Sequence, residues 1–525
     1  MVQKQHVVLI LILIIYQSFL IYLILNTNLT FFSDDAIYAS LARFFLEGKY
    51  SLIFHPAWPP LYPILSALVF LFIKNWEISL RMVSALSITL MLLPLFFLSK
   101  KIIGSVSSVF FLVTIILNLN ILQIALFPQT DALAAFLIVF SFVCMFFAFW
   151  DFQRYSKLLF LSSFLCGLAF LTRSEGTLFF AVYLSFLIFF LSAQIFRKKL
   201  LFKNFLFVPL FIAIFIVTIS PYIYVMKNKL GYWTLSQKFN AQIQQDHAFS
   251  FKNNTTWSQE VVSVKNPNYQ SDYFKDSTEY ILDNFNKYRI WFFQKLNKWT
   301  QVALEIFPLW FFMIAGLGLL NIADKKLFWP LTFTLFVFTT TIPITVFSTA
   351  IPDIRYLFWT IPIVIFLYYF GFLFLVKKIF RNKYLLIIPF LLTLFFPSTL
   401  RSELFNIDYS LIKSINNINY RPEILEISDW ITKNTDKNPK IMARHEVFEF
   451  YTNGETIYIP QTSVNNVVNY GLEKNADLLI AWERELAGEK ELAPLFNNSF
   501  NHSNLEKIYS TNTQDGTLII YKLRK

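Results

Sequence analysis

Two neighbouring carboxylates, Asp34 and Asp35, follow the first long apolar segment of the chain. A short amphipathic helix is predicted directly after them, over residues 36–47, and either acid can cap it by accepting hydrogen bonds from free backbone N–H groups. One carboxylate is enough to cap the helix, so the cap does not account for the second carboxylate of the pair. A second carboxylate at the edge of a membrane can act as a general base towards a hydroxyl group, or hold a divalent cation such as Mg²⁺, Mn²⁺ or Zn²⁺.

Other ionisable residues stand beside apolar runs in the same way. They are Arg43, His55, Arg81, Asp131, Arg173, Glu175, Asp353 and Arg355. The arginines are candidates for binding a phosphate through the planar guanidinium, and Asp131, His55 and Glu175 are candidates for binding a substrate or a metal. Plain structural interpretations stay open beside these. Asp131 can cap the following helix, Arg173 can simply neutralise Glu175, and a histidine is most often an ordinary surface residue.

The composition indicates what positions these side chains. Hydrophobic residues make up 56% of the 525-residue chain and charged residues only 15%, whereas soluble proteins carry about 25% charged residues. Apolar runs of about 18 or more residues recur along the chain, and each can cross a bilayer as a helix. These features predict an α-helical polytopic membrane protein. We attribute the net charge of +12 to cytoplasmic loops, and not to binding of nucleic acid.

The positive-inside rule arranges the apolar runs into about eleven spans. They are predicted at 7–25, 79–99, 105–127, 131–150, 158–172, 177–195, 205–226, 301–320, 328–349, 356–376 and 384–398. The run at 59–73 is short and opens with two prolines, so we expect it to be interfacial or re-entrant. The N-terminus is then cytoplasmic, every short basic cluster lies on that side, and the first run is expected to be a span and not a removed signal peptide.

This topology also gathers the candidate residues on the outer face of the membrane. They lie at the span ends opposite the basic clusters, either in or near the exterior loop 26–78 or in short exterior turns between later spans, and a second long exterior loop is expected at 227–300. Charge next to the apolar layer is costly, so ionisable groups kept there are functional candidates. Acids that can serve as a base or a metal ligand, together with arginines that can bind an anion, suit a lipid phosphate as a leaving group.

A different pattern follows the last span, so two domains are predicted, 1–398 in the membrane and 399–525 outside it. Short runs with strand character alternate with helical segments. The strands are expected at 440–444, 456–460, 477–482, 506–511 and 517–523, and the helices at 421–434, 445–451 and 463–474. Such alternation predicts a small α/β domain. It has no phosphate-binding glycine loop and no nucleophile elbow, and no catalytic signature is evident in it.

The order of these motifs resembles the GT-C superfamily of membrane glycosyltransferases, in particular the family 39-like group of protein O-mannosyltransferases and lipid A aminoarabinose transferases. The matching stretches are SDDAIYASLARFFLEGKY, PAWPPLYPILSALVFLF, SLRMVSALSITLMLLPLFFLSKKIIG, FPQTDALAAFLIVFSF, GLAFLTRSEGTLFF and IRYLFWTIPIVIFL. The resemblance implies a GT-C fold in the plasma (inner) membrane. It also implies transfer of a sugar, with inversion, from a polyprenyl-phosphate donor to an acceptor outside, which can be a glycan, a lipid or a protein.

The resemblance further implies roles for single residues. The acidic pair matches the family's first exterior loop, so Asp34, or failing that Asp35, would be the base that activates the acceptor hydroxyl. Asp131 matches an exterior acid of the family. Arg173 stands where the family often has lysine and would contact the donor phosphate, and Arg355 matches the last exterior basic residue.

One departure from the family concerns a metal site. The lipid A transferases carry an acid and a lysine just before the two prolines, where this chain has Ala57 and Trp58. Metal ligation at this point is therefore in question, although His55 stands nearby.

Two other function classes stay open at this stage. A transporter or flippase of a lipid-linked or anionic solute is the first, although transporters place their charges at the membrane midplane and often contain repeats. The charges of this chain cluster at one face, and no repeat is evident. The second is a non-catalytic assembly protein that displays an exterior α/β module.

Overall fold

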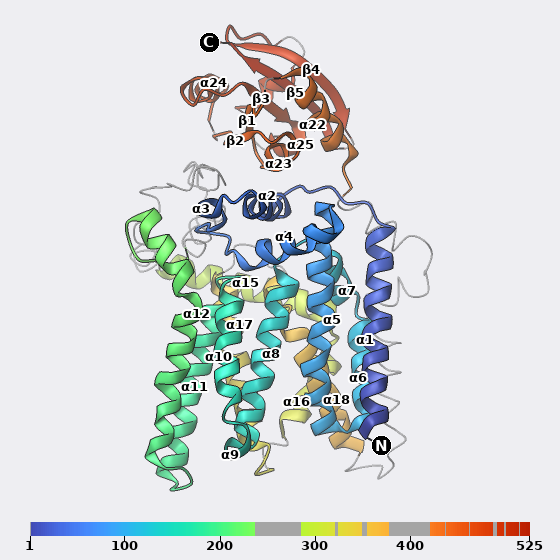
Figure 1. Cartoon of the computed structure of the whole chain (residues 1–525), viewed down its shortest axis with the longest axis vertical. Coiled ribbons are helices and arrows are strands. Elements are labelled where there is room, and N and C mark those ends of the chain that lie inside the picture. Colours follow the sequence, from blue (N-terminus) through green and yellow to red (C-terminus); the bar gives the residue numbers. More distant parts are fainter. Residues whose placement is uncertain are drawn as a thin grey trace.

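The computed structural model describes residues 2–236, 285–320, 324–348, 354–376, 420–435, 437–460, 462–486, 491–497, 500–513 and 515–524. This part of the chain forms a helical bundle, a layer of short helices across one end of it, and a small α/β domain beyond that layer (Figure 1). We call this the domain-facing end of the bundle; the N-terminus lies at the other end (Figure 1). The predicted span 384–398, Asp353 and the predicted boundary between 398 and 399 lie outside the described residues.

Long apolar helices make up most of the bundle. Six of them are long and apolar enough to cross a membrane. They include α1 (Val2–Leu25), α5 (Trp76–Ile103), α8 (Asp131–Trp150), α11 (Gly176–Phe196), α12 (Phe207–Leu230) and α17 (Phe328–Ser348). All six coincide with predicted spans. Their apolar sequences agree with an integral membrane protein, because a helix satisfies its own backbone hydrogen bonds in a medium without water.

The predicted count of about eleven spans is not confirmed. The described residues contain six spans, or up to eight if each of two bent helix pairs is one span. Helices α6 (Ser105–Ile116) and α7 (Leu119–Leu126) meet at 60°, and α15 (Phe285–Ile306) and α16 (Leu309–Leu319) meet at 94°. Pro308 stands between the second pair, and proline interrupts the helical hydrogen-bond ladder.

Three further apolar helices are too short for the same test. They are α4 (Leu61–Ile73), α10 (Leu158–Phe170) and α18 (Thr360–Leu375). A helix of 13 residues such as α10 is about 20 Å long, less than the roughly 30 Å of a bilayer core. Hydropathy alone had predicted full spans for α10 and α18.

The layer at the domain-facing end consists of α2 (Asp34–Leu46), α3 (Tyr50–Ile53) and α4 (Figure 1). Helix α4 corresponds to the run that was expected to be interfacial, and it packs against both α2 and α5. The backbone N–H of Leu61 donates to the carbonyl of Leu171 at 2.9 Å. This bond attaches the start of α4 to the end of α10, close to Arg173.

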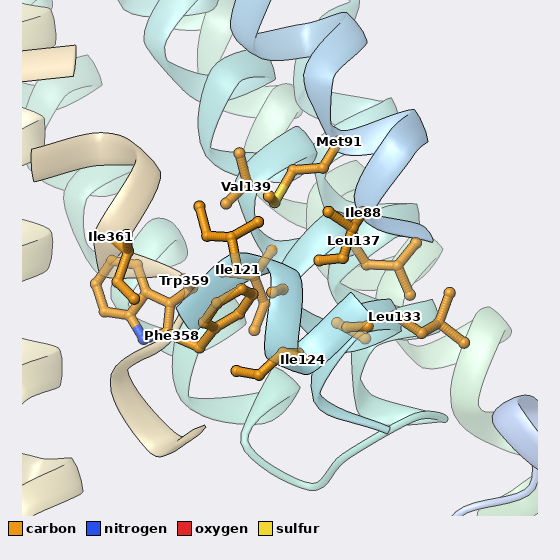
Figure 2. Close-up of a cluster of buried hydrophobic side chains, with 14 of the residues drawn as sticks. Ile88, Met91, Ile121, Ile124, Leu133, Leu137, Val139, Phe358, Trp359 and Ile361 are labelled. Atoms are coloured by element: carbon orange, nitrogen blue, oxygen red, sulfur yellow. The ribbon is translucent and has the colours of Figure 1, made fainter. Parts of the chain in front are cut away.

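A dense apolar core lies between α5, α7, α8 and the start of α18 (Figure 2). Its labelled side chains, all buried, are Ile88, Met91, Ile121, Ile124, Leu133, Leu137, Val139, Phe358, Trp359 and Ile361. Close packing of this kind leaves little room for the helices to shift against one another. The core therefore fixes the start of α8 and the residues just before α18, which carry Asp131 and Arg355.

The C-terminal α/β domain is built on one five-stranded sheet in the order β2-β1-β3-β5-β4. The strands are β1 (Lys440–Ala443), β2 (Glu455–Tyr458), β3 (Leu478–Trp482), β4 (Leu505–Thr513) and β5 (Gly516–Leu523). Strand β1 is parallel to both β2 and β3, and β5 is antiparallel to both β3 and β4. Every residue of the central strand β3 is buried, as expected for a strand covered on both faces.

Three helices accompany the strands of this domain at the positions that the sequence predicted; the first precedes β1, the second joins β1 to β2, and the third joins β2 to β3. They are α22 (Pro422–Asn434), α23 (Val447–Thr452) and α24 (Val464–Glu473). The prediction of a small α/β domain is therefore confirmed. The β4–β5 turn ends at Gly516, whose φ of 103° lies in a region that glycine adopts without the steric cost of a side chain.

Candidate active site at the domain-facing end of the bundle

The two acids that open α2 have different environments. Asp35 is 7% exposed, and its Oδ1 accepts hydrogen bonds from the backbone N–H groups of Phe32, Ser33 and Ala36 at 3.0, 2.7 and 3.0 Å. Burial raises the pKa of Asp35 to about 6, although the three N–H groups act in the opposite direction. This carboxylate caps the helix and shapes the segment before it.

Asp34 has no hydrogen bond or ion pair within the described residues, and it is only half-buried. Tyr38 lies one helical turn further along α2. Burial raises the pKa of Tyr38, and the charge of Asp34 raises it further. In the α/β domain, burial and Glu449 raise the pKa of Glu446, and Asp34 adds to this rise. Asp34 therefore lies between the bundle and the α/β domain with its carboxylate unneutralised.

A cluster of compensating charges lies on the rim of the bundle beside α2. The Arg173 guanidinium, in the turn between α10 and α11, pairs through Nη1 with Oδ1 of Asp131 and through Nη2 with Oε1 of Glu175, the latter at 2.9 Å. The side chains of Arg173 and Asp131 are 12% and 3% exposed. The guanidinium also lies over the ring of Tyr356, 5.4 Å from its centroid.

Arg355 completes this group, which we call the rim cluster: Asp131, Arg173, Glu175, Arg355 and Tyr356. Its Nη1 donates to Oε1 of Gln129 at 3.0 Å. Burial raises the pKa of Tyr356, Arg173 and Arg355 lower it, and Glu175 and Asp131 raise it further. The charges of Arg173, Arg355, Glu175 and Asp131 therefore all affect the Tyr356 phenol, and the two arginines compensate the charge of the two acids.

Tyr38 connects Asp34 with the rim cluster. Its hydroxyl lies 3.4 Å from Oγ1 of Thr130, the residue just before α8. Burial has the largest effect on the pKa of Tyr38, and the charges of Asp34, Arg173 and Asp131 also shift it. Asp34, Arg173 and Asp131 therefore all act on a single buried hydroxyl group, which lies against the start of α8.

Sequence reasoning missed Tyr38, Gln129 and Tyr356, because none of them is charged. A signal for Tyr38 was nevertheless present, since residues four apart on a helix share a face. Tyr38 follows Asp34 at that spacing. Tyr356 and Gln129 stand next to predicted site residues in the sequence, but their roles depend on contacts between separate helices.

Two arginines that were candidates for a phosphate lie elsewhere. Arg43 points towards the α/β domain, where its Nη1 donates to the carbonyl of Phe450 at 2.9 Å and its guanidinium lies 5.2 Å from the Phe450 ring. Arg81 is 2% exposed and is held by carbonyl groups. Its Nε donates to Leu126 at 2.9 Å, and its Nη1 donates to Ile24 at 3.1 Å and to Thr27 at 2.9 Å. Arg81 therefore has a structural role.

His55 is buried, at 2% exposure, so the interpretation as a surface histidine was wrong. Its Nδ1 accepts a hydrogen bond from the N–H of Ala57 at 3.1 Å, its ring packs against Trp58, and burial lowers its pKa to about 3. Within the described residues, no three His, Cys, Asp or Glu side chains gather closely enough to hold a metal ion. The divalent cation stays a prediction, and no chemical step below depends on it.

No protein-family model and no curated protein sequence matches this chain. Among solved structures, the crystal structure of ArnT from Cupriavidus metallidurans bound to undecaprenyl phosphate matches with a TM-score of 0.55 and 12% identity, over 99% of this chain and 98% of that one. ArnT from Cupriavidus metallidurans in the apo state matches with a TM-score of 0.56 and 11% identity, over 98% and 97%. From the membrane bundle to the α/β domain, the chain thus has an ArnT-like fold.

Proposed function

We propose that this protein is an inverting GT-C glycosyltransferase that uses a polyprenyl-phosphate-linked sugar. The observation that carries the proposal is that an unneutralised carboxylate, Asp34, and Arg173 of the rim cluster both act on the hydroxyl of Tyr38, with Arg355 joining Arg173 around Tyr356. Transfer of a sugar from a lipid phosphate needs a base for the acceptor and cations for the leaving group. Asp34 supplies the first, and Arg173 and Arg355 supply the second.

The step begins when Asp34 accepts the proton of an acceptor hydroxyl. The acceptor oxygen attacks the anomeric carbon from the side opposite the phosphate, and the bond between that carbon and the phosphate oxygen breaks. The electron pair goes to the phosphate, which leaves as polyprenyl phosphate, and the configuration at the anomeric carbon inverts. Interactions that strengthen as charge develops on the leaving oxygen lower the barrier most.

The rim cluster suits a phosphate because its arginines are held by carboxylate and amide oxygens. A phosphate presents the same kind of acceptor and can replace Glu175 or Gln129 as the partner of Arg173 or Arg355. Asp131 can then keep Arg173 in place, since it is the more buried of the two acids bound to it.

An apolar cavity of about 480 Å³ lies between α15, α16, α17 and α18. Almost all of its lining is hydrophobic, and it includes Leu357, the residue after Tyr356. A lipid chain whose phosphate meets Arg355 has this cavity within reach. The full-length likeness to an ArnT structure bound to undecaprenyl phosphate supports a donor of this class.

The proposed site lies at the outer surface of the plasma membrane, with the N-terminus in the cytoplasm and the α/β domain outside. Lys100 and Lys101 in the last turn of α5, and Arg197 at the end of α11, lie on the side of the bundle away from the α/β domain, as the positive-inside rule requires. The sugar, and whether the acceptor is a glycan, a lipid or a protein, stay open in this proposal.

A transporter or flippase is the alternative function. The site charges favour the enzyme, because they sit at helix ends beside the α/β domain, and not at mid-depth where transporters bind their substrates. A flippase also has no need for an unpaired carboxylate next to its phosphate ligands.

The test uses purified protein in lipid vesicles and a panel of polyprenyl-phosphate sugars that carry the label in the sugar. We expect the label to leave the lipid and to appear on an acceptor from an envelope extract or in water, and Asp34→Asn to abolish this release. Movement of intact labelled lipid between leaflets without bond cleavage would favour the flippase. Arg524→Ala removes an exposed ion pair with Glu506 and serves as the control that keeps activity.

A further inference from the structure

The short segment before Asp34 is held at every residue from Thr30 to Ser33. Asp35 binds the N–H groups of Phe32 and Ser33, as described above. The α/β domain holds the two residues before them, although it lies about four hundred positions later in the chain. The N–H of Arg421 donates to Oγ1 of Thr30 at 3.2 Å, and the N–H of Phe31 donates to the Tyr451 hydroxyl at 3.1 Å.

Tyr451 links three parts of the molecule through its hydroxyl group. It accepts the bond from Phe31, and it donates to Oε1 of Glu77, in the first turn of α5, at 3.0 Å. The Phe31 ring packs edge-on against Phe450, with ring centroids 5.1 Å apart. The end of α23 is thereby fastened to both the bundle and the segment that leads to Asp34.

Phe32 inserts its ring into a cage on the α/β domain. The guanidinium groups of Arg421 and Arg484 lie 4.7 and 4.8 Å from the ring centroid, within the range of cation–π attraction. His445 and Trp482 complete the cage, with centroids at 5.0 and 5.8 Å. Asp34 follows Phe32 by two positions, so the cage fixes the backbone directly in front of it.

We infer that the α/β domain is a positioning element for the proposed base, and that Phe32 and Tyr451 are the positioning residues through which it acts. This inference rests on the proposed function, because it assigns the domain's effect to Asp34. Asp35 holds the end of this segment through hydrogen bonds to Phe32 and Ser33, and the α/β domain holds its start through bonds to Thr30 and Phe31. The domain shows no catalytic signature of its own, yet its docking decides where the carboxylate stands relative to the rim cluster.

The expected effect is on turnover and not on donor binding. Misplacing a catalytic group by about 1 Å can cost around a hundredfold in rate, whereas the contacts given above for the arginines proposed to bind the donor phosphate are with the rim cluster and Gln129. Phe32→Leu and Tyr451→Phe should therefore each lower kcat by roughly tenfold or more, with the KM for the lipid donor within about twofold of its original value. Phe32→Trp keeps an aromatic face for the two arginines and should restore most of the loss.

The experiment combines this kinetic comparison with amide hydrogen exchange of residues 29–36 in the full-length protein. The exchange needs no substrate, and it should become at least about tenfold faster in Phe32→Leu and Tyr451→Phe as local opening becomes easier. Lys433→Ala, which removes an exposed ion pair with Asp429 on α22 of the same domain, is the matched control and should leave both readouts unchanged.

Unchanged exchange in both variants would overturn the inference, as would faster exchange with an unchanged kcat. A rise in donor KM at constant kcat would also overturn it. If the unaltered protein cleaves none of the donors, the proposed function fails and the positioning role for Asp34 fails with it. The exchange data would then report only whether the domain holds the segment.

Discussion

The rim cluster and the segment that carries Asp34 are built in opposite ways. In the rim cluster, each charge meets a charge or a strong dipole: Arg173 is bound by Asp131 and Glu175, and Arg355 by Gln129. The segment before α2 is held through its backbone N–H groups and aromatic rings, and the half-buried acid that follows it, Asp34, has no hydrogen bond or ion pair within the described residues. The first arrangement can exchange one anion for another, and the second keeps a carboxylate available for a proton.

Under the proposed function, this difference assigns the two substrates to the two regions. A lipid phosphate that enters the rim cluster would take the place of an acceptor group already bound to an arginine, so the site would not have to desolvate an additional unpaired cation. An acceptor hydroxyl would meet Asp34 on the side of the α/β domain. The following predictions test whether the two regions do have separate roles.

The largest expected effect separates the two acids of α2. Asp34→Asn should lower sugar transfer by about a thousandfold, as loss of a general base does. Asp35→Asn should lower it by no more than about fivefold, because an amide oxygen can still accept the capping bonds. Transfer rates of both variants, at matched amounts of folded protein, check this. Equal losses would mean that the division between base and cap is wrong.

The next effect concerns the donor. Arg173→Ala should raise the concentration of polyprenyl-phosphate sugar needed for half-maximal rate by about ten- to a hundredfold, since hydrogen bonds to charged groups contribute about 1.5–3 kcal/mol. Arg173→Lys should recover part of the lost donor affinity, because lysine keeps the positive charge. The recovery should be incomplete, because lysine lacks the planar guanidinium that binds a phosphate through two donors. Donor titrations measure it. A lower kcat with an unchanged donor requirement would place the phosphate elsewhere.

A third prediction compares Arg173 with the structural arginine. Arg81→Ala removes the donor from the carbonyl oxygens of Ile24, Thr27 and Leu126 and should destabilise the folded protein by about 2–3 kcal/mol. The fraction that folds should bind the donor normally. Thermal unfolding in detergent, followed by donor titration of the folded fraction, tests both statements. A changed donor affinity at normal stability would contradict the structural role.

The smallest effect comes from the buried cap. The pKa of Asp35 is raised to about 6 from 3.8, so the folded state holds its proton more tightly than the unfolded chain does. The free energy of unfolding should then fall as the pH rises from about 4 to about 6, and it should level off above that range. Asp35→Asn removes this contribution. Its Tm should drop less over this range than that of the unaltered protein, and parallel Tm curves would refute the assignment.

Much of the fold and part of the site followed from the sequence because the relevant signals are local. Apolar and polar residues alternate at strand and helix periods after residue 420, and the strands of the α/β domain form where that alternation predicts them. The rim cluster was predicted in outline because basic residues mark one side of the membrane. Asp131, Arg173, Glu175 and Arg355 then had to share the other side.

The remaining features depend on contacts between distant segments or on backbone geometry. Only the three backbone N–H groups that bind Asp35 distinguish this acid, as the cap, from Asp34, the proposed base. The cage around Phe32 joins residues from both ends of the chain, and the carbonyl groups that hold Arg81 come from α1, from Thr27 just after it, and from α7. The predicted number of spans is not confirmed within the described residues, because hydropathy records apolar residues but neither the bend at Pro308 nor the short length of α10.

The most direct test of the central claim is an experimental structure with a polyprenyl phosphate bound. The account predicts that the phosphate lies within hydrogen-bond distance of Arg173 or Arg355, with the lipid chain towards the cavity lined by α15 to α18. The Asp34 carboxylate should face the phosphate across the space that a sugar would fill. A phosphate held instead by Arg43 beside the α/β domain, or with Asp34 turned away from it, would contradict the account.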